Sequence, residues 1–414
     1  MKTSRRASAL LPRLALVLGV VGCDGSAARV DAGADAPQEV ASGDVAVESS
    51  VDAGPVDAAP PPPTLRLNDV SVLFPLPPDQ EAAGYLRPTD RGAHGELLPR
   101  AVFDAIPTFP VVPADGIAYD RMRVLSLRVD GCGGPHDTCY PQIRLVMQPM
   151  RGSLARDSAL HLFFRLEAGE MGDVVGELRR MRSLAPGLTD GPLDVHPALA
   201  TQGVTGPWGA ALRALVLRHV GAARLTRVTF FLRAPPVQEV WFFGGLDRNG
   251  EAFEPMTIVG VGRGNQRVIH TDEAAGYRYD LTPVAVTPED HSAVLSAAAS
   301  ARAAADARDR ALASLHRVEN PARYVPDELP CAGCHLATYV LAEAARTHGA
   351  SPDRFAADRF TSSRHDLSLR GAAVESPSSL RAFGWFNTDA VISQRTVNES
   401  AAVVDDLDRR YPPR

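Results

Sequence analysis

Lysine is almost absent from this 414-residue chain. It occurs once, as Lys2, so nearly every basic residue is an arginine. Arginine side chains are forked cations that stay charged at any physiological pH. Acidic residues nevertheless outnumber basic ones by 49 to 43. Nucleic-acid-binding proteins usually have an excess of basic residues, which this chain lacks. We therefore expect no nucleic-acid partner.

Long apolar runs are missing from the start of the chain. Residues 1–22 contain four basic residues, no acidic residue and one apolar run at 14–21. That run is too short for a comfortable transmembrane helix, and basic residues followed by a short apolar run are typical of an export signal. We therefore expect residues 1–22 to be removed as a signal peptide. Of the 43 basic residues, 39 then remain against 49 acidic ones, a net charge of about −10.

The end of this segment, Val20-Val21-Gly22-Cys23, resembles the lipobox of bacterial lipoproteins. In that family the cysteine is acylated and becomes the mature N-terminus, and two or more acyl chains anchor a protein stably. The resemblance implies lipidation of Cys23 and the membrane as a partner. It also implies a place in the bacterial cell envelope, with the folded part in the periplasm or at the cell surface. An ordinary secretory signal with an incidental cysteine is the alternative, and the choice between inner and outer membrane stays open.

Residues 23–64 have a low-complexity composition. Eight acidic residues face a single Arg29, and Pro60 to Pro63 form a proline run. Such a segment cannot bury enough apolar surface to fold, and charge repulsion keeps it extended. We expect a disordered tether between the anchor and the folded part.

The composition becomes globular near Leu65, and about 350 residues are more than one core usually organises. We expect an α+β protein of two domains. The first, residues 65–285, should be an antiparallel β-sandwich-like domain with a helical insertion at 174–184, because alternating apolar runs are separated by Gly and Pro turn signals. A hairpin turn is expected at 247–250. The expected strands are 123–129, 143–147, 160–166, 212–220, 225–232, 237–243, 256–261 and 267–270.

Cys132 and Cys139 flank a short loop between two of these strands. Cysteine pairs in an oxidising compartment have no reason to stay reduced. We expect a disulfide between them, which would pin the loop rather than support the whole domain, because the closed loop is short.

The second domain, residues 286–414, should be small and mainly α-helical. Thr287-Pro288 is a helix-start signal followed by an alanine-rich stretch to residue 317. A second helix is expected at 336–347, ending at Gly349, and a final one should end near Arg410.

Cys331-Ala332-Gly333-Cys334-His335 is a Cys-x-x-Cys-His motif in a chain that carries an export signal. Outside the cytoplasm this motif is the attachment signature of a c-type haem, whereas a cytosolic Cys-x-x-Cys more often binds zinc or performs redox chemistry. The two thiols form thioethers with the haem vinyl groups, and the histidine ligates the iron. We expect one covalent haem c on Cys331 and Cys334, with His335 as the proximal ligand.

A helix that leaves directly from this motif resembles the cytochromes c, over about a quarter of the chain. The disulfide-bearing β domain, the single motif and the segment Arg381-Ala382-Phe383-Gly384-Trp385-Phe386 together resemble a group of functionally uncharacterised bacterial lipoproteins. Two features depart from the cytochromes c: the usual glycine-and-aromatic helix before the motif is not recognisable, and no methionine follows Met256. The usual methionine ligand is therefore missing.

The sixth iron ligand must then be a histidine, a residue of the first domain, or nothing. His365 is our first candidate because it follows the motif by about thirty residues, in a polar loop. His316 and His348, near the ends of two expected helices, are the alternatives. Two imidazoles would give a lower reduction potential than imidazole with thioether, whereas an empty site would bind a small ligand or peroxide.

These features favour a membrane-anchored monohaem electron carrier with a redox partner protein in the envelope. One alternative is a peroxidase-like haem enzyme, although bacterial cytochrome peroxidases carry two attachment motifs. The other is a lipoprotein whose β domain binds a ligand or partner, with the haem as an accessory. Residues 65–283 contain no His-x-x-x-His pair that could bind zinc and no Gly-x-Ser-x-Gly motif of a serine nucleophile. They also contain no pair of carboxylates at a spacing typical of a catalytic site. We interpret the scattered polar residues as structural; these are Asp157, His161, His196, His219 and His270.

Overall fold

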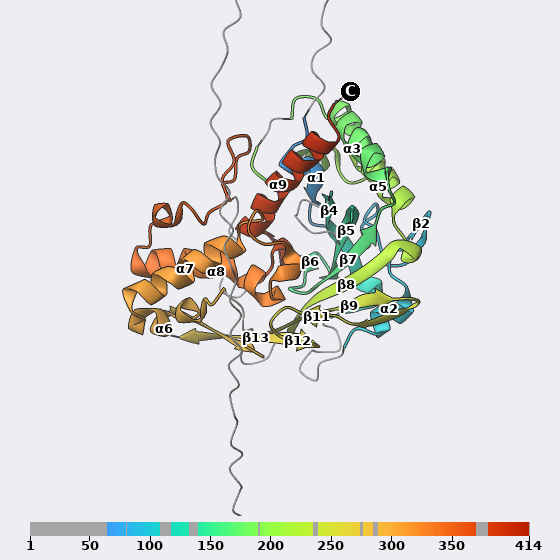
Figure 1. The fold of residues 1–414 in the computed structure, drawn as a ribbon. Helices are drawn as coiled ribbons and strands as arrows, with labels where there is room; N and C mark the ends of the chain where they lie inside the picture. The colour runs from blue at the N-terminus through green and yellow to red at the C-terminus, as the bar shows by residue number, and fades with distance from the viewer. Residues whose placement is uncertain are drawn as a thin grey trace, which may run out of the picture. The chain divides into compact units, whose positions relative to one another are not determined.

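A ten-stranded antiparallel sheet organises the chain (Figure 1). The structure is a computed structural model, and it describes residues 64–413 except 80, 108–116, 132–139, 189–190, 235–238, 274–275, 285–288 and 370–379. The expected signal peptide, Cys23, the tether and the Cys132–Cys139 pair lie outside the described residues. The strand order is β1-β4-β5-β7-β8-β9-β13-β14, with β6 beside β5 and β10 beside β9.

The ten strands are β1 (Ser71–Leu73), β4 (Met122–Asp130), β5 (Gln142–Arg151), β6 (Leu154–Ala155), β7 (Ala159–Arg165), β8 (Leu225–Ala234), β9 (Glu239–Asn249), β10 (Ala252–Pro255), β13 (Asn265–Glu273) and β14 (Gly276–Thr282). Small two-stranded sheets are formed by β2 (Arg91–Gly92) with β3 (Gly95–Glu96), β11 (Thr257–Ile258) with β12 (Gly262–Arg263), and β15 (Phe383–Phe386) with β16 (Asp389–Ile392). The helices are α1 (Leu67–Val70), α2 (Arg100–Asp104), α3 (Glu170–Met181), α4 (Pro197–Gln202), α5 (Pro207–His219), α6 (Ala297–Arg302), α7 (Ala305–Val318), α8 (Cys331–His348) and α9 (Gln394–Arg410). Short 3₁₀ turns occupy Tyr119–Arg121, Arg182–Leu184, Ala222–Arg224, Ser292–Val294, Pro326–Glu328 and Pro352–Phe355.

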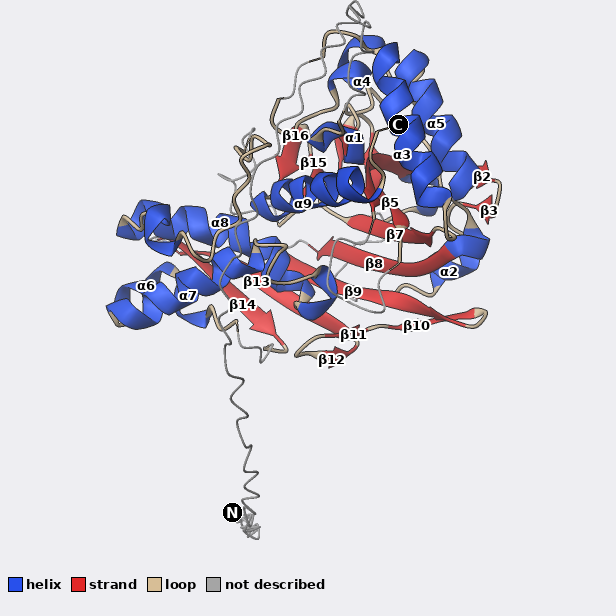
Figure 2. Cartoon of the chain, turned by 45° about the horizontal axis from the view of Figure 1, so that its top comes forward, coloured by secondary structure: helices blue, strands red, loops and turns tan. Residues whose placement is uncertain are grey.

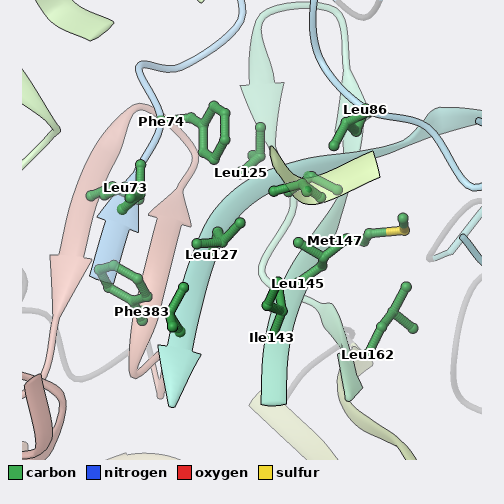
Figure 3. Packing of buried hydrophobic residues seen from close by; sticks show 14 of the residues in the cluster. Leu73, Phe74, Leu86, Leu125, Leu127, Ile143, Leu145, Met147, Leu162 and Phe383 are labelled. Atoms are coloured by element: carbon green, nitrogen blue, oxygen red, sulfur yellow. The ribbon is translucent and has the colours of Figure 1, made fainter. Parts of the chain in front are cut away.

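One face of the sheet carries aliphatic residues in register across four strands. Leu127 pairs with Leu145, Leu145 with Leu162, and Leu162 with Val228. Paired residues project to the same face, so these side chains form a continuous apolar surface (Figure 3). They belong to the larger hydrophobic core, which also contains the buried side of α3 and α5.

The opposite face is aromatic at its β8 to β14 end. Phe231 pairs with Phe243, and Trp241 with Val268. These residues share a second core with the buried sides of α7 and α8. Figure 2 shows these two helices beside β13 and β14. The helices that follow residue 286 therefore cover the sheet rather than pack only on one another.

The C-terminal helix α9 returns to the beginning of the described chain. The Ser400 and Ser71 hydroxyl oxygens lie 2.7 Å apart, and the Leu65 amide donates to the Asp408 carboxylate at 3.2 Å. Residues 60–414 form a single compact unit. A separate domain from residue 286 stays a prediction, whereas the expected combination of a large antiparallel sheet with helices is confirmed.

Several expectations differ from the structure. Of the expected strand 256–261, only Thr257–Ile258 forms a strand, as β11. Within the described chain, the second layer on the main sheet consists of helices and not of the second large sheet that a sandwich requires. The run 212–220 falls mostly in α5: Leu212, Leu215, Val216 and His219 are buried at helical spacing, so its apolar residues suit a helix face as well as a strand.

The expected alanine-rich helix begins later than its Thr287-Pro288 signal. It starts at Ala297, where the Ser296 hydroxyl accepts a hydrogen bond from the Ala299 amide, and a break after Arg302 separates α6 from α7. The helices at 174–184, 336–347 and 393–410 are confirmed in α3, α8 and α9, with Gly349 in the left-handed conformation after α8. No helix among the described residues is long and apolar enough to span a membrane.

Candidate haem-attachment site

The Cys-x-x-Cys-His motif forms the first turn of α8. Pro330 precedes the helix, and Cys331 is its first residue. Residues three and four apart share one side of a helix, so Cys331, Cys334 and His335 project together. Gly333 faces the other way, where it approaches His291. The Ala332 amide donates to Gln266 Oε1 of β13 at 3.1 Å, which fixes the turn to the sheet.

The ring of His335 rests on two aromatic residues of the sheet. The ring centroids of Phe231 and Phe243 lie 5.4 and 4.8 Å from that of His335. His335 Nδ1 is hydrogen-bonded to the carbonyl oxygen of Leu380. Because a carbonyl can only accept, Nδ1 must be the donor, and Nε2 of the neutral ring keeps its lone pair. Burial lowers the pKa of His335 to about 4, so the ring is neutral at pH 7.

The two cysteines are free thiols that keep some accessible surface. Burial raises the pKa of Cys331 to about 12 and that of Cys334 to about 11. For Cys334, the positive charge of Arg395 works in the opposite direction, and the negative charge of Glu399 adds to the rise. A buried charged cluster therefore lies close enough to Cys334 to act on it.

This cluster contains three guanidinium groups around one glutamate. Glu399 accepts hydrogen bonds from Arg395 Nε at 2.5 Å and from Arg128 Nη1. Burial alone would raise the pKa of Glu399, but Arg395, Arg128 and Arg144 hold it at about 2. Asp130 lies 4.0 Å from Arg144. Glu319 also acts on the charge of Arg395, so three carboxyl groups accompany the three guanidinium groups.

Two nitrogen atoms of the cluster have no hydrogen-bond partner within the described chain. They are Nε of Arg128 and Nε of Arg144, and both are buried. The Arg144 guanidinium also lies over the ring of Phe163, with 4.5 Å between Cζ and the ring centroid. Buried donors without acceptors cost free energy, so this region lacks an acidic or accepting group.

His161 of β7 lies on the same side of the sheet as this site. Ala159 pairs with Phe231, and His161 pairs with Thr229. Its side chain therefore projects to the face that carries Phe231. The pKa of His161 lies well below its usual value because of burial first, then the charges of Arg144, His335 and Arg381.

From the sequence we expect His161 to be an ordinary structural residue of a strand. The available signal was alternation: Leu160, Leu162 and Phe164 are fully buried in the larger core, which leaves His161 on the other face. The motif at Cys331–His335 lies near that face, but it follows His161 in the sequence by about 170 residues. No local sequence pattern predicts that two segments so far apart come together.

The described contacts of the three histidines predicted as sixth ligands do not include the motif residues. His365 Nε2 is 3.2 Å from Asp405 Oδ1, and His316 packs against the ring of Phe355 with 5.3 Å between the centroids. Both histidines line one pocket of about 590 Å³ whose lining does not include the motif residues. His348 ends α8, thirteen residues after His335, so the helical rise separates the two by about 20 Å along the axis.

The other polar residues singled out in the sheet region have structural partners. Asp157 accepts from Trp241 Nε1 at 2.9 Å, and His196 stacks on Trp208 at 3.7 Å. His219 Nδ1 lies 3.4 Å from Glu170 Oε1, and His270 contacts the ring of Tyr279. No group of three or more His, Cys, Asp or Glu side chains suited to a metal ion occurs in the part of the chain that the structure describes.

Comparison of the chain with protein-family models, with curated proteins and with solved structures finds no match.

Proposed function

We propose that the protein is a membrane-anchored monohaem c-type electron carrier of the bacterial cell envelope. In this proposal Cys331 and Cys334 hold the haem through thioethers, and His335 is the proximal ligand. The bound iron would supply one-electron chemistry by alternating between its ferrous and ferric states. Residues 286–414 would then be the cytochrome c-like part of the chain.

The observation that carries the proposal is the hydrogen bond from His335 Nδ1 to the Leu380 carbonyl. Metal-binding histidines commonly donate their second ring nitrogen to a carbonyl or carboxylate, which fixes the ring and its tautomer. Here the bond leaves Nε2 free to bind a metal. The same helical turn carries both thiols on the side of His335, as attachment at two vinyl groups requires.

The buried charges near Cys334 also fit a haem. A haem has two propionate carboxylates, and carboxylates form strong charge-assisted hydrogen bonds with guanidinium groups. Arg128 and Arg144 each retain a buried Nε without a hydrogen-bond partner. A propionate would supply the missing acceptor for these two arginines.

The neutral thiols fit the proposed chemistry better than they fit zinc. Zinc sites use thiolates, and no third or fourth ligand joins Cys331 and Cys334 among the described residues. Thioether formation requires only that each sulfur can reach a vinyl group, and both cysteines keep accessible surface.

The lipid on Cys23 and the tether at 23–64 would hold this electron carrier at the membrane. The acidic, lysine-poor mature chain suits a protein partner better than nucleic acid. We infer that the carrier docks a redox partner in the envelope.

Ligand binding by the β-rich part is a second candidate function, and one pocket favours it. A pocket of about 1220 Å³ is lined in part by Arg66, Arg179, Arg180, Arg182 and Arg410. The lining also includes Asp69 and Asp173, but its arginines outnumber these carboxylates, which suits an anionic ligand. Thermal unfolding with added inorganic phosphate or succinate, compared between the wild type and Arg180→Ala, tests it: a midpoint that rises for the wild type alone supports the function.

Spectroscopy tests the proposed electron carrier. The full chain is produced for export in a host with a working c-type maturation system, beside a Cys331→Ser/Cys334→Ser variant. We expect a haem spectrum that alternates reversibly between oxidised and reduced forms, taking up one electron per chain, and no such spectrum for the double variant. A wild type without haem absorption contradicts the proposal. A haem that consumes peroxide rapidly would favour the peroxidase-like alternative instead.

A further inference from the structure

We propose that His161 of β7 is the sixth iron ligand, so that the sheet and α8 each contribute one imidazole. The proposal rests on the haem attachment proposed above. It replaces His365, His316 and His348 with a residue from the β-rich part of the chain.

The register of the sheet places His161 next to Phe231, on which the proximal histidine rests. His335 rests on Phe231, and the partner of Phe231 in β7 is Ala159, two residues from His161. On one face of a sheet, a diagonal neighbour of this kind lies about 7–8 Å away. The side chains of His161 and Phe231 therefore stand next to each other, and His335 lies against Phe231 from the helix side.

Arg144 also belongs to this face. Arg144 pairs with Phe163, and Val146 pairs with His161. The buried Nε of Arg144 has no hydrogen-bond partner. If His335 and His161 hold a haem, one of its propionates would supply an acceptor for this nitrogen. His161, Phe231 and Arg144 share one face of the sheet, so the residues that would hold the iron and pair with a propionate belong to the same region.

The other buried histidines near α8 do not share this position. His291 lies near Gly333, and its Nε2 is buried without a hydrogen-bond partner. Gly333 is two positions from Cys331 and His335, which puts it on the opposite side of α8. His270 packs between Trp241 and Tyr279, beyond Phe243 on the sheet.

His161→Ala tests the proposal, with His291→Ala as the matched control. Both remove a neutral, desolvated imidazole near the motif. In the haem-loaded wild type we expect a low-spin ferric spectrum and no binding of carbon monoxide by the ferrous form. His161→Ala should be high-spin and bind one carbon monoxide per haem, and free imidazole should restore the low-spin spectrum. His291→Ala and His365→Ala should keep the wild-type spectrum.

Rescue by imidazole separates lost ligation from lost folding, because a misfolded variant would not regain the wild-type spectrum. A low-spin spectrum of His161→Ala without added imidazole overturns the assignment of this ligand. So does a wild type that is already high-spin; both results leave the haem attachment intact. A wild type without any covalent haem overturns the proposed function together with this ligand.

Discussion

The ring of His335 stacks on the ring of Phe231, with 5.4 Å between the centroids and 22° between the planes. One residue belongs to the first turn of α8, and the other to β8 in the middle of the sheet. The chemistry of the motif is therefore shaped by the sheet, although the two segments are about a hundred residues apart in the sequence.

Phe231→Ala removes one of the two aromatic rings that contact the ring of His335. Phe231 is buried, and a Phe to Ala change at such a site costs about 3–5 kcal/mol of unfolding free energy. We expect this loss in urea unfolding. Phe253→Ala, at a half-buried position of β10, should cost clearly less. If both variants lost the same unfolding free energy, the region around Phe231 and His335 would be loosely packed, contrary to this prediction.

Glu399→Gln removes the carboxylate that is hydrogen-bonded to Arg395 and Arg128 and is also influenced by the charge of Arg144. Breaking a buried ion pair at one partner costs about 3–5 kcal/mol, because the remaining charge stays buried. Asp306→Asn breaks the exposed pair with Arg310 and should leave the unfolding free energy unchanged.

In the haem-loaded protein, the loss caused by Glu399→Gln should be smaller than in the haem-free protein, because propionates would share the positive charge. Equal losses in the two forms would contradict a propionate near these arginines.

Glu319 makes the stability of the fold depend on pH. Burial raises its pKa to about 7 from 4.5, although the hydrogen bond from Thr338 and the charges of Arg395 and Arg359 lower it. The folded state therefore binds more protons than the unfolded state between these values. The unfolding free energy should fall as pH rises from about 4.5 to 7, and the loss should stay constant above pH 7.

Glu319→Gln should remove this dependence. A pKa shift of this size corresponds to roughly 3 kcal/mol of unfolding free energy. Between pH 4.5 and pH 8, the unfolding free energy of the variant should therefore rise relative to that of the wild type by up to about this amount. Urea unfolding at both pH values measures the gain. A constant difference between the two proteins across this range would mean that Glu319 ionises normally.

The sequence predicted those parts of the fold and site that depend on local pattern. Gly349 marks the end of α8, and alternation identified β4 and β5. The helix expected at 336–347 begins earlier, at Cys331, so the Cys-x-x-Cys-His motif lies in its first turn. Each of these features is decided within a few residues.

The remaining parts depend on pairings that are distant in the sequence. The apolar run in α5 was read as a strand, because its residues fit either period and only the sheet packed against it decides. The contact of α8 with β8 and β13 brings Phe231 and Gln266 to the motif, and strand register brings His161 to the same face. None of these contacts leaves a periodic signal in the chain.

The intact mass of the exported protein tests the central claim most directly. Matured in a host that attaches c-type haem and denatured before measurement, the chain should carry the added mass of one haem. Cys331→Ser/Cys334→Ser should lack that mass, whereas His161→Ala should retain it. A wild-type chain with no added haem mass would contradict the account.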